Sequence, residues 1–551
     1  MRTVQRGRGR LLTGLAVLVV LVVLTLPPDL RDVGPWTFLR LPLEAVLLLG
    51  VLVAIPPGRR EVRRVVALAA GTVLGVMAVF RLLDVGFLRA LNRPFDPLID
   101  WRYAGSLADL VRNSFGDALG AALLVAAATA AVTLLVLMPL AVLRVTRMAA
   151  AHRRTTGRAA VALAVGWTVA AVTTGIGVGA LASRDAAGYV YAQVARIPAQ
   201  LRDQREFAAA AEHDPFDRVD AEDLLAGLRG KDVLVVFVES LGRVALEDPA
   251  VSPDVVEVLD SGTRRLARAG FASRSAWLTS PTFGGISWLA HATLQSGLWV
   301  DSQRRYDVLV TSPRLTLSRL FARAGWRTVA DVPANDRAWP QGEFYGFDRV
   351  YDSRHVGYRG PPFGYATMPD QFTLEAFHRL ELARRARRPV MAEIDLVSSH
   401  APWAPTPRMV DWSALGDGSL YDGMDAEVPS EDDVWPSPER VRQAYAESVA
   451  YSLTALVEFV VRHGDEDLVV VFLGDHQPAT IVSGEDAGPD VPIALVAHDA
   501  GVLDRVAGWG WDDGLRPGAG APVWRMDLFR DRFLAAYGRS RHSGAQAGAA
   551  R

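Results

Sequence analysis

The residues with the clearest capacity for chemistry follow two long apolar runs. One run, VLVVFV at 233–238, is followed by Glu239, and the other, LVVVFLG at 468–474, is followed by Asp475 and His476. Continuous runs rich in Val and Phe are typical of strands buried on both faces of an α/β sheet, and ligands bind at the carboxyl ends of such strands. Two carboxylates and an imidazole there indicate a divalent metal site. The alternative is that these polar side chains only cap loops.

A candidate nucleophile lies in the segment SPTFGGISWLAHATLQSG at 280–297. A Gly-Gly turn, then Ser287, then an apolar helical run places this serine at a helix N-terminus, where backbone N–H groups favour an anion. A hydroxyl that also contacts a metal ion becomes a usable alkoxide. The alternative is that Ser287 only caps the helix. The nearby hydroxyls of Ser280 and Thr282 compete for the nucleophile's role.

The elements that must position these residues alternate between strand and helix from about residue 230. This alternation predicts a C-terminal α/β domain with a mostly parallel, doubly wound central sheet. The segment 405–440 is rich in Pro, Asp, Gly and Ser and is interpreted as an insertion loop. The predicted strands cover 232–239, 327–331, 389–395, 468–474 and 491–497, and the predicted helices cover 263–269, 315–324 and 448–462.

The first third of the chain has the pattern of a membrane region. Five apolar stretches approach or exceed the roughly 20 residues that a helix needs to cross a bilayer. Basic residues cluster at the N-terminus, at 59–64 between the second and third stretches, and at 144–158 between the fourth and fifth, so all three clusters lie on the same side of the membrane. The positive-inside tendency then predicts a cytoplasmic N-terminus and an extracytoplasmic C-terminal domain. The alternative is Ala-rich helices buried in a soluble protein. The predicted spans lie near 11–27, 38–56, 64–83, 117–143 and 160–182.

Length and composition narrow the class of protein. A chain of 551 residues is too long for one simple domain. The 59 Lys and Arg nearly balance the 61 Asp and Glu, which gives no indication of nucleic-acid binding. The absence of cysteine excludes disulfides, thiolate metal sites and a cysteine nucleophile. The predicted organisation is a transmembrane region at 1–183, a linker at 184–229, a catalytic domain at 230–538 and a disordered tail at 539–551.

The motifs resemble those of the sulfatase and alkaline phosphatase superfamily. The spacing from Ser287 through His291 and Leu294 to Ser296-Gly297 resembles the sulfatase signature, whose first residue is the nucleophile. The five-span layout before an extracytoplasmic domain resembles lipoteichoic acid synthase-like phosphoglycerol transferases. Phosphoethanolamine transferases belong to the same membrane-bound branch.

The same branch has a metal-binding glutamate and a late metal-binding Asp-His pair. Glu239 at the end of the first run resembles that glutamate, and Gly-Asp475-His476 resembles that pair. The resemblance implies one divalent ion held by Glu239, Ser287, Asp475 and His476. It favours Mn²⁺ or Mg²⁺, with Zn²⁺ and Ca²⁺ as alternatives.

The chain also departs from the family patterns. Leu289 stands where formylglycine sulfatases have Pro or Ala, which argues against conversion of Ser287 to formylglycine. Lipoteichoic acid synthases use threonine as nucleophile, whereas this chain offers serine. His291 replaces the sulfatase arginine, which weakens any inference of sulfate-ester chemistry.

Two further segments resemble substrate-binding loops of the superfamily. Ser398-Ser-His400-Ala-Pro402-Trp403 resembles the loop whose histidine contacts the substrate phosphate or sulfate, and the segment with Arg337 and Trp339 resembles a stretch that grips phosphate. Arg337 could clamp an anionic oxygen with its planar fork. The alternatives are a structural histidine and an arginine that pairs with Asp336 or Asp331.

The resemblance implies a metal-dependent transferase. It would move a phospho-alcohol group, such as phosphoglycerol or phosphoethanolamine, from a membrane lipid donor to an envelope polymer or glycolipid acceptor through a covalent serine intermediate. His400 would protonate the leaving alcohol, and Arg337, Trp339 and His291 would bind substrate. The alternatives are a sulfate- or phosphate-ester hydrolase and a non-catalytic, envelope-binding membrane protein.

Overall fold

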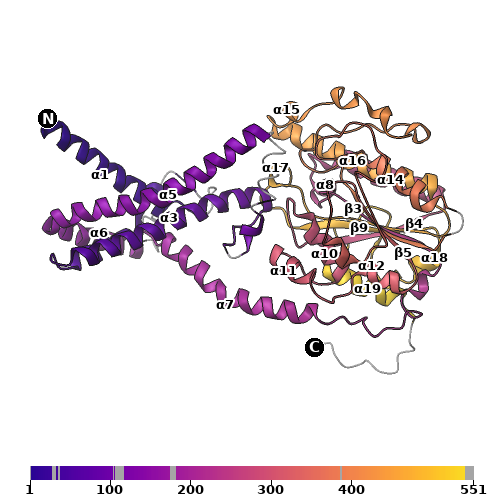
Figure 1. Cartoon of the computed structure of the whole chain (residues 1–551), viewed down its shortest axis with the longest axis horizontal. Helices are drawn as coiled ribbons and strands as arrows, with labels where there is room; N and C mark the ends of the chain where they lie inside the picture. The colour runs from indigo at the N-terminus through magenta and orange to yellow at the C-terminus, as the bar shows by residue number, and fades with distance from the viewer. Residues whose placement is uncertain are drawn as a thin grey trace. The chain divides into compact units, whose positions relative to one another are not determined.

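The computed structural model divides the chain into two compact units (Figure 1). The first comprises residues 1–88 and 93–204, and the second comprises residues 89–92 and 205–551. The predicted tail beyond residue 539 lies outside the residues that the structure describes. The described residues are 2–27, 33–34, 37–97, 99–103, 105, 117–173, 182–384 and 387–539.

The first unit contains the apolar helices that make this chain a membrane protein. Four of the predicted spans overlap helices of 21 to 35 residues, and residues 174–181 of the span predicted at 160–182 lie outside the described residues. The second predicted span, 38–56, coincides with a helix of only 12 residues, shorter than a bilayer crossing requires. The predicted linker begins with a 27-residue helix, α7. The helices of this unit are α1 (Arg2–Thr25), α2 (Leu43–Ala54), α3 (Arg60–Leu91), α5 (Asp117–Ala151), α6 (Arg153–Thr173) and α7 (Asp185–Ala211).

The second unit is built on a nine-stranded sheet. Its centre has the order β8-β3-β7-β5-β6, and all of these neighbours are parallel. β9 then joins antiparallel to β8, and β4 joins antiparallel to β9. The strands are β3 (Asp232–Val238), β4 (Ala272–Thr279), β5 (Arg327–Val332), β6 (Arg349–Asp352), β7 (Val390–Leu396), β8 (Leu468–Gly474), β9 (Asp490–Ala497), β10 (Asp512–Asp513) and β11 (Val523–Arg525).

Helices cover both faces of this sheet (Figure 1). Each face has its own hydrophobic core, because alternate residues of β3 contribute to the two clusters, Val236 to one and Val235 to the other. α8, α9, α14 and α16 lie over the first core, and α10, α12 and α19 lie over the second. The predicted fold class is therefore confirmed. The helices are α8 (Val244–Glu247), α9 (Ser252–Arg268), α10 (Ser287–Ser296), α11 (Gln303–Leu309), α12 (Leu317–Arg323), α13 (Gly342–Tyr345), α14 (Asp370–Phe377), α15 (Glu431–Val434), α16 (Pro438–His463), α17 (Thr480–Ser483), α18 (Ala500–Asp504) and α19 (Asp527–Tyr537).

Among the described residues, five helices are long and apolar enough to cross a membrane, and one of them is α16. This helix is largely buried in the second unit, where it packs against α9 and α14. Its apolar character therefore serves the core of the α/β domain. The other four helices, α1, α3, α5 and α6, belong to the first unit.

Candidate active site

The order of the parallel strands places the candidate residues next to one another. β8, β3 and β7 are neighbours, and their last residues Gly474, Val238 and Leu396 are aligned in register. The residues that follow them, Asp475-His476, Glu239 and the loop to His400, therefore emerge side by side at one edge of the sheet. Carboxyl ends of parallel strands are the usual place for a site in such a fold.

Two of these loops pack backbone against backbone. A Cβ atom at Gly474 would lie 1.8 Å from the carbonyl oxygen of Leu241, so only glycine fits directly before Asp475. Asp475 Oδ1 accepts hydrogen bonds from the backbone N–H groups of Ser240 (2.7 Å) and His476 (2.8 Å). Ser240 itself has a left-handed φ of 57°. This close approach fixes the Asp475 carboxylate beside Glu239.

A strained turn delivers Ser287 to the same place. Gly285 has φ of 149° and Ile286 has φ of 66°, and a positive φ is a true outlier for a β-branched residue. The turn is held to the Asp475-His476 loop because the N–H of Gly284 donates to the carbonyl oxygen of Gln477 at 2.9 Å. Helix α10 then begins at Ser287, as the Gly-Gly-x-Ser pattern predicts. Strain of this kind is stored at functional sites.

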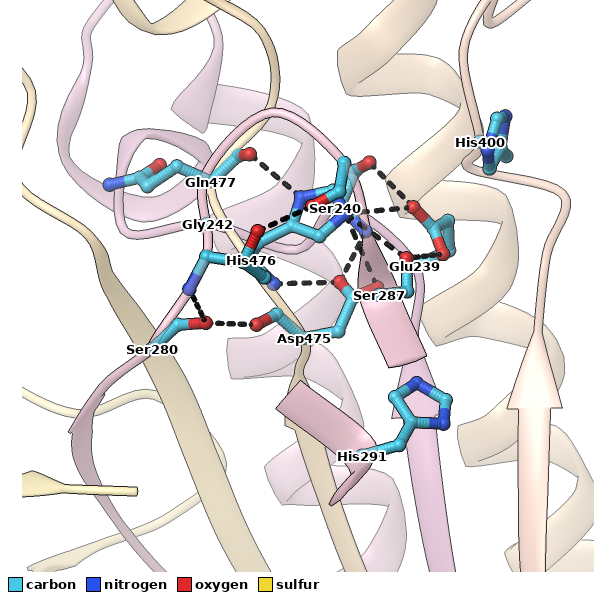
Figure 2. A network of polar contacts seen from close by, with 12 residues as sticks. Glu239, Ser240, Gly242, Ser280, Ser287, His291, His400, Asp475, His476 and Gln477 are labelled. Carbon is cyan, nitrogen blue, oxygen red and sulfur yellow. Dashed lines mark hydrogen bonds and ion pairs between the residues drawn. The ribbon is translucent and has the colours of Figure 1, made fainter. Parts of the chain in front are cut away.

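The hydroxyl of Ser287 contacts two of the predicted metal ligands (Figure 2). Its Oγ donates to Glu239 Oε2 at 2.9 Å and lies 3.2 Å from His476 Nε2. The competing hydroxyls are used elsewhere. Ser280 donates to the backbone carbonyl of Asp475, and Thr282 donates to that of Gly285 at 2.6 Å. Of the three candidate hydroxyls, the geometry therefore favours Ser287.

His476 Nε2 and Asp475 Oδ2 face the same point. Because a carbonyl oxygen can only accept, the 2.8 Å contact between His476 Nδ1 and the Gln477 carbonyl places a proton on Nδ1. Nε2 is then the ligand atom, and it lies 3.2 Å from Glu239 Oε1 and 3.5 Å from Asp475 Oδ2. Asp475 Oδ2 is buried without a hydrogen bond from any described residue. Such an oxygen, beside an oriented imidazole, fits a divalent cation.

The electrostatics of the cluster also fit a divalent cation. Burial raises the pKa of Asp475 to about 7, and the neighbouring Glu239 charge adds to the effect. Burial opposes the charged form of His476, but the carboxylates of Asp475 and Glu239 outweigh it and raise its pKa to about 9. Burial also opposes the charge of Glu239, yet His400 and His476 hold its pKa well below its usual range. A proton on His476 thus neutralises part of the carboxylate charge that a cation would neutralise.

His291 lies one helical turn beyond Ser287 in a second group of ionisable residues. Its ring stacks on Phe237 with centroids 3.8 Å apart. Its Nδ1 lies 3.2 Å from Glu393 Oε1 and 3.6 Å from Asp395 Oδ1. Burial disfavours the imidazolium, but Asp395 and Glu393 raise the pKa of His291 to about 9. These two carboxylates therefore favour the imidazolium form of His291, close to the cluster.

Glu393 and Asp395 were not among the predicted site residues. Both belong to β7, and Asp395 is the last residue of the strand predicted at 389–395. Two acidic residues at i and i+2 in a buried strand share one face. That spacing within the run VMAEIDL was the available signal.

His400 lies across Glu239 from Ser287 (Figure 2). Its ring stacks on Tyr365 with centroids 3.6 Å apart, and its Nδ1 bonds the carbonyl of Ala401, which leaves Nε2 as the reactive atom. Burial lowers the pKa of His400, although the Glu239 charge works in the opposite direction. Among the described contacts, His400 does not hydrogen-bond Ser287.

Arg337 and Trp339 are not brought into the cluster by any described contact. The Arg337 side chain is 80% exposed, and its guanidinium lies 3.4 Å from Asp336, which is the pairing considered as the alternative. Trp339 packs against Tyr345, with ring centroids 5.2 Å apart. Their substrate-binding roles stay predictions.

Comparison with known proteins places the second unit in a family. Residues 231–492 match the family model described as Sulfatase. This match contains Glu239, Ser287, His400 and the Asp475-His476 pair. None of the curated proteins compared with this chain matches it in sequence.

Several solved structures are similar at low identity. The lipoteichoic acid synthase LtaP from Listeria monocytogenes is 16% identical, with 62% of this chain and 79% of that chain covered and a TM-score of 0.38. The periplasmic domain of EcEptC from Escherichia coli, in complex with Zn, is 12% identical over 56% and 82%, with a TM-score of 0.36. The phosphoglycerol transferase GacH from Streptococcus pyogenes is 12% identical over 62% and 92%, with a TM-score of 0.33. Likenesses at this level leave the choice of substrate to the chemistry of the site.

Proposed function

We propose that this chain, an enzyme of the sulfatase and alkaline phosphatase superfamily, transfers a phospho-alcohol group from a membrane lipid to an envelope acceptor. The observation that carries the proposal is the Ser287 hydroxyl, held within 3.2 Å of Glu239 and His476, beside Asp475 Oδ2, which accepts no hydrogen bond from the described residues. A serine hydroxyl in contact with side chains that can bind a metal ion fits covalent phosphoryl transfer. The apolar helices of the first unit keep the enzyme in the membrane, which suits a lipid donor.

The metal would be held by Glu239, Asp475, His476 and the Ser287 oxygen. A divalent ion bound there lowers the pKa of the hydroxyl and stabilises charge on the phosphoryl oxygens. The oxygen-rich set favours Mn²⁺ or Mg²⁺. Zn²⁺ and Ca²⁺ are the alternatives.

The chain's own residues then carry out two displacements at phosphorus. In the first, the bond from Ser287 Oγ to phosphorus forms, the bond to the diacylglycerol oxygen breaks, and the serine proton leaves to solvent. Protonated His400 gives its Nε2 proton to the departing alkoxide. In the second, His400 takes the proton of the acceptor hydroxyl, the acceptor oxygen bonds to phosphorus, and Ser287 Oγ departs and regains a proton from solvent. The imidazolium of His291 lies where it would attract the anionic group.

Lipid turnover tests this proposal directly. The full-length protein, in vesicles that contain phosphatidylglycerol or phosphatidylethanolamine, is supplied with Mn²⁺, and diacylglycerol release is measured. Ser287→Ala should abolish release, and Thr282→Ala is the matched control because its hydroxyl serves only the turn. Release with free glycerol phosphate or ethanolamine phosphate would identify the hydrolase alternative. No release from either lipid, with a bound metal, would contradict the lipid-transferase proposal.

We further propose that the N-terminus is cytoplasmic and the catalytic domain, about 230–538, is extracytoplasmic. The support is the alternation of basic segments along the first unit. This orientation requires residues 38–56 to cross the membrane although α2 has only 12 residues. If that segment turned back within the bilayer, the number of crossings would become even and the assignment would reverse.

A further inference from the structure

A second group of metal-binding side chains lies at the opposite end of the sheet from the active site. It comprises Glu375 in α14, His378 directly after it, and His463 at the end of α16. The chain passes from His463 into the N-terminal end of β8, whereas Asp475 follows the C-terminal end of that strand. A strand of seven residues separates the two ends by roughly 20 Å. The group is therefore independent of the Ser287 site.

The three side chains converge closely. One ligand atom from each lies within 4.8 Å of the others. His463 Nε2 is 3.0 Å from Glu375 Oε2, and the rings of His378 and His463 stack with centroids 3.8 Å apart. Glu375 and His378 are three residues apart, so they lie on one helical face. His378 opens a π-helical turn at His378–Leu382, a local feature frequent at functional sites.

The chemistry of the group suits a transition metal. Burial lowers the pKa of His378, and the charge of His463 adds to this effect. Burial and then Arg462 lower the pKa of His463. Among the described residues, no hydrogen bond reaches the His378 ring. All three residues are partly exposed, so an ion and a water can enter.

We infer that Glu375, His378 and His463 bind a zinc ion, separate from the ion of the active site. Two imidazoles and one carboxylate are a donor set that Zn²⁺ prefers over Mg²⁺ or Ca²⁺, with water as a fourth ligand. The ion ties the α14 segment to the end of α16, immediately before the strand that carries Asp475. Without an ion, the group would be only a His–carboxylate hydrogen bond with a stacked ring.

Zinc counting in the full-length protein tests the inference. Asp475→Asn removes a ligand of the active site, so metal that this variant retains and then loses with His378→Gln or His463→Gln reports on the second group. After exposure to Zn²⁺ and desalting, the variant should retain about one zinc per chain. Adding His378→Gln or His463→Gln should reduce this to near zero. Adding His355→Gln is the matched control, because this half-exposed imidazole also contacts a carboxylate, Asp352, and it should leave the count unchanged.

Cobalt substitution gives a readout that a purely structural histidine pair would not change. Co²⁺ in the Asp475→Asn variant should give visible absorption of a four-coordinate site, and His378→Gln should remove it. Circular dichroism establishes that the variants remain folded. Loss of zinc from Asp475→Asn alone, or an unchanged count in both histidine variants, would overturn the inference. Lipid turnover plays no part in these measurements, so their outcome is distinct from that of the proposed function.

Discussion

Asp475 should make the protein less stable without metal and more stable with it. Its folded pKa of about 7 is above the ordinary value of 3.8, because the carboxylate is buried. The ionised form therefore opposes folding above pH 7, and this cost disappears as the pH falls below the unfolded value. A shift of about three units corresponds to about 4 kcal/mol. Asp475→Asn relieves that cost at pH 8.

Asp475→Asn also loses part of the stability that it gains by removing the buried charge. The amide N–H group that replaces Oδ2 faces His476 Nε2, and a buried donor left without an acceptor costs about 1–3 kcal/mol. The amide oxygen still accepts from the backbone N–H groups of Ser240 and His476. We therefore expect metal-free Asp475→Asn to be more stable than metal-free wild type by about 1–3 kcal/mol at pH 8.

Bound metal should reverse the order of stability of wild type and Asp475→Asn. At a free ion concentration of 100 Kd, wild type gains about 2.7 kcal/mol, and Asp475→Asn gains none. The assay is thermal unfolding of the full-length protein followed by tryptophan fluorescence, with chelator and then with Mn²⁺. All but three of the chain's 14 tryptophans lie in the second unit, so the signal reports on the α/β domain.

Ser280→Ala is the matched control for this prediction. It removes a hydroxyl bonded to the Asp475 backbone carbonyl and leaves the carboxylate in place, so the Mn²⁺ shift should persist. A metal-free Asp475→Asn protein that is several kcal/mol less stable than wild type would refute the electrostatic reasoning. A Mn²⁺ shift in that variant as large as in wild type would remove Asp475 from the ligand set.

Three further predictions address other parts of the account. His400→Gln should lower kcat for lipid turnover by about 10²–10⁴-fold with an unchanged Mn²⁺ shift, and equal turnover would exclude it as the acid and base. His291→Ala should raise KM for the lipid donor more than it lowers kcat, because its cation is proposed to bind the anionic group; steady-state kinetics with both lipids separates the two effects. A C-terminal alkaline phosphatase fusion should be active in cells and a C-terminal fluorescent protein that matures only in the cytoplasm should be dark; the opposite pair of results would reverse the orientation.

The fold was predictable where one pattern dominated. The apolar runs before Glu239 and Asp475 fit strands buried on both faces, and both are in the centre of the sheet. β4, whose sequence is ASRSAWLT, was not predicted, because its polar residues break the apolar pattern. β4 is placed in the sheet by its antiparallel pairing with β9, and the local sequence does not indicate this pairing. α2 fills only Leu43–Ala54 of the predicted span 38–56, because an apolar stretch reports composition and not where the helix begins.

The candidate site was predictable as far as strand ends and glycine turns determine it. Glu239, Asp475 and His476 follow directly from their strands, and the Gly-Gly turn places Ser287. The partners of His291 were missed, since a contact between α10 and β7 depends on tertiary packing. The same holds for the group around His463, which lies about 85 residues after Glu375 and His378 in the chain.

Mass spectrometry of the modified peptide tests the central claim most directly. Full-length protein is incubated with vesicles that contain the active lipid donor, quenched with acid and digested, and the peptide around residues 280–297 is sequenced. The account predicts a phosphoglycerol or phosphoethanolamine adduct on Ser287 that is absent in Ser287→Ala and present in Thr282→Ala. An adduct that persists in Ser287→Ala and disappears in Thr282→Ala would contradict the account and move the nucleophile to Thr282.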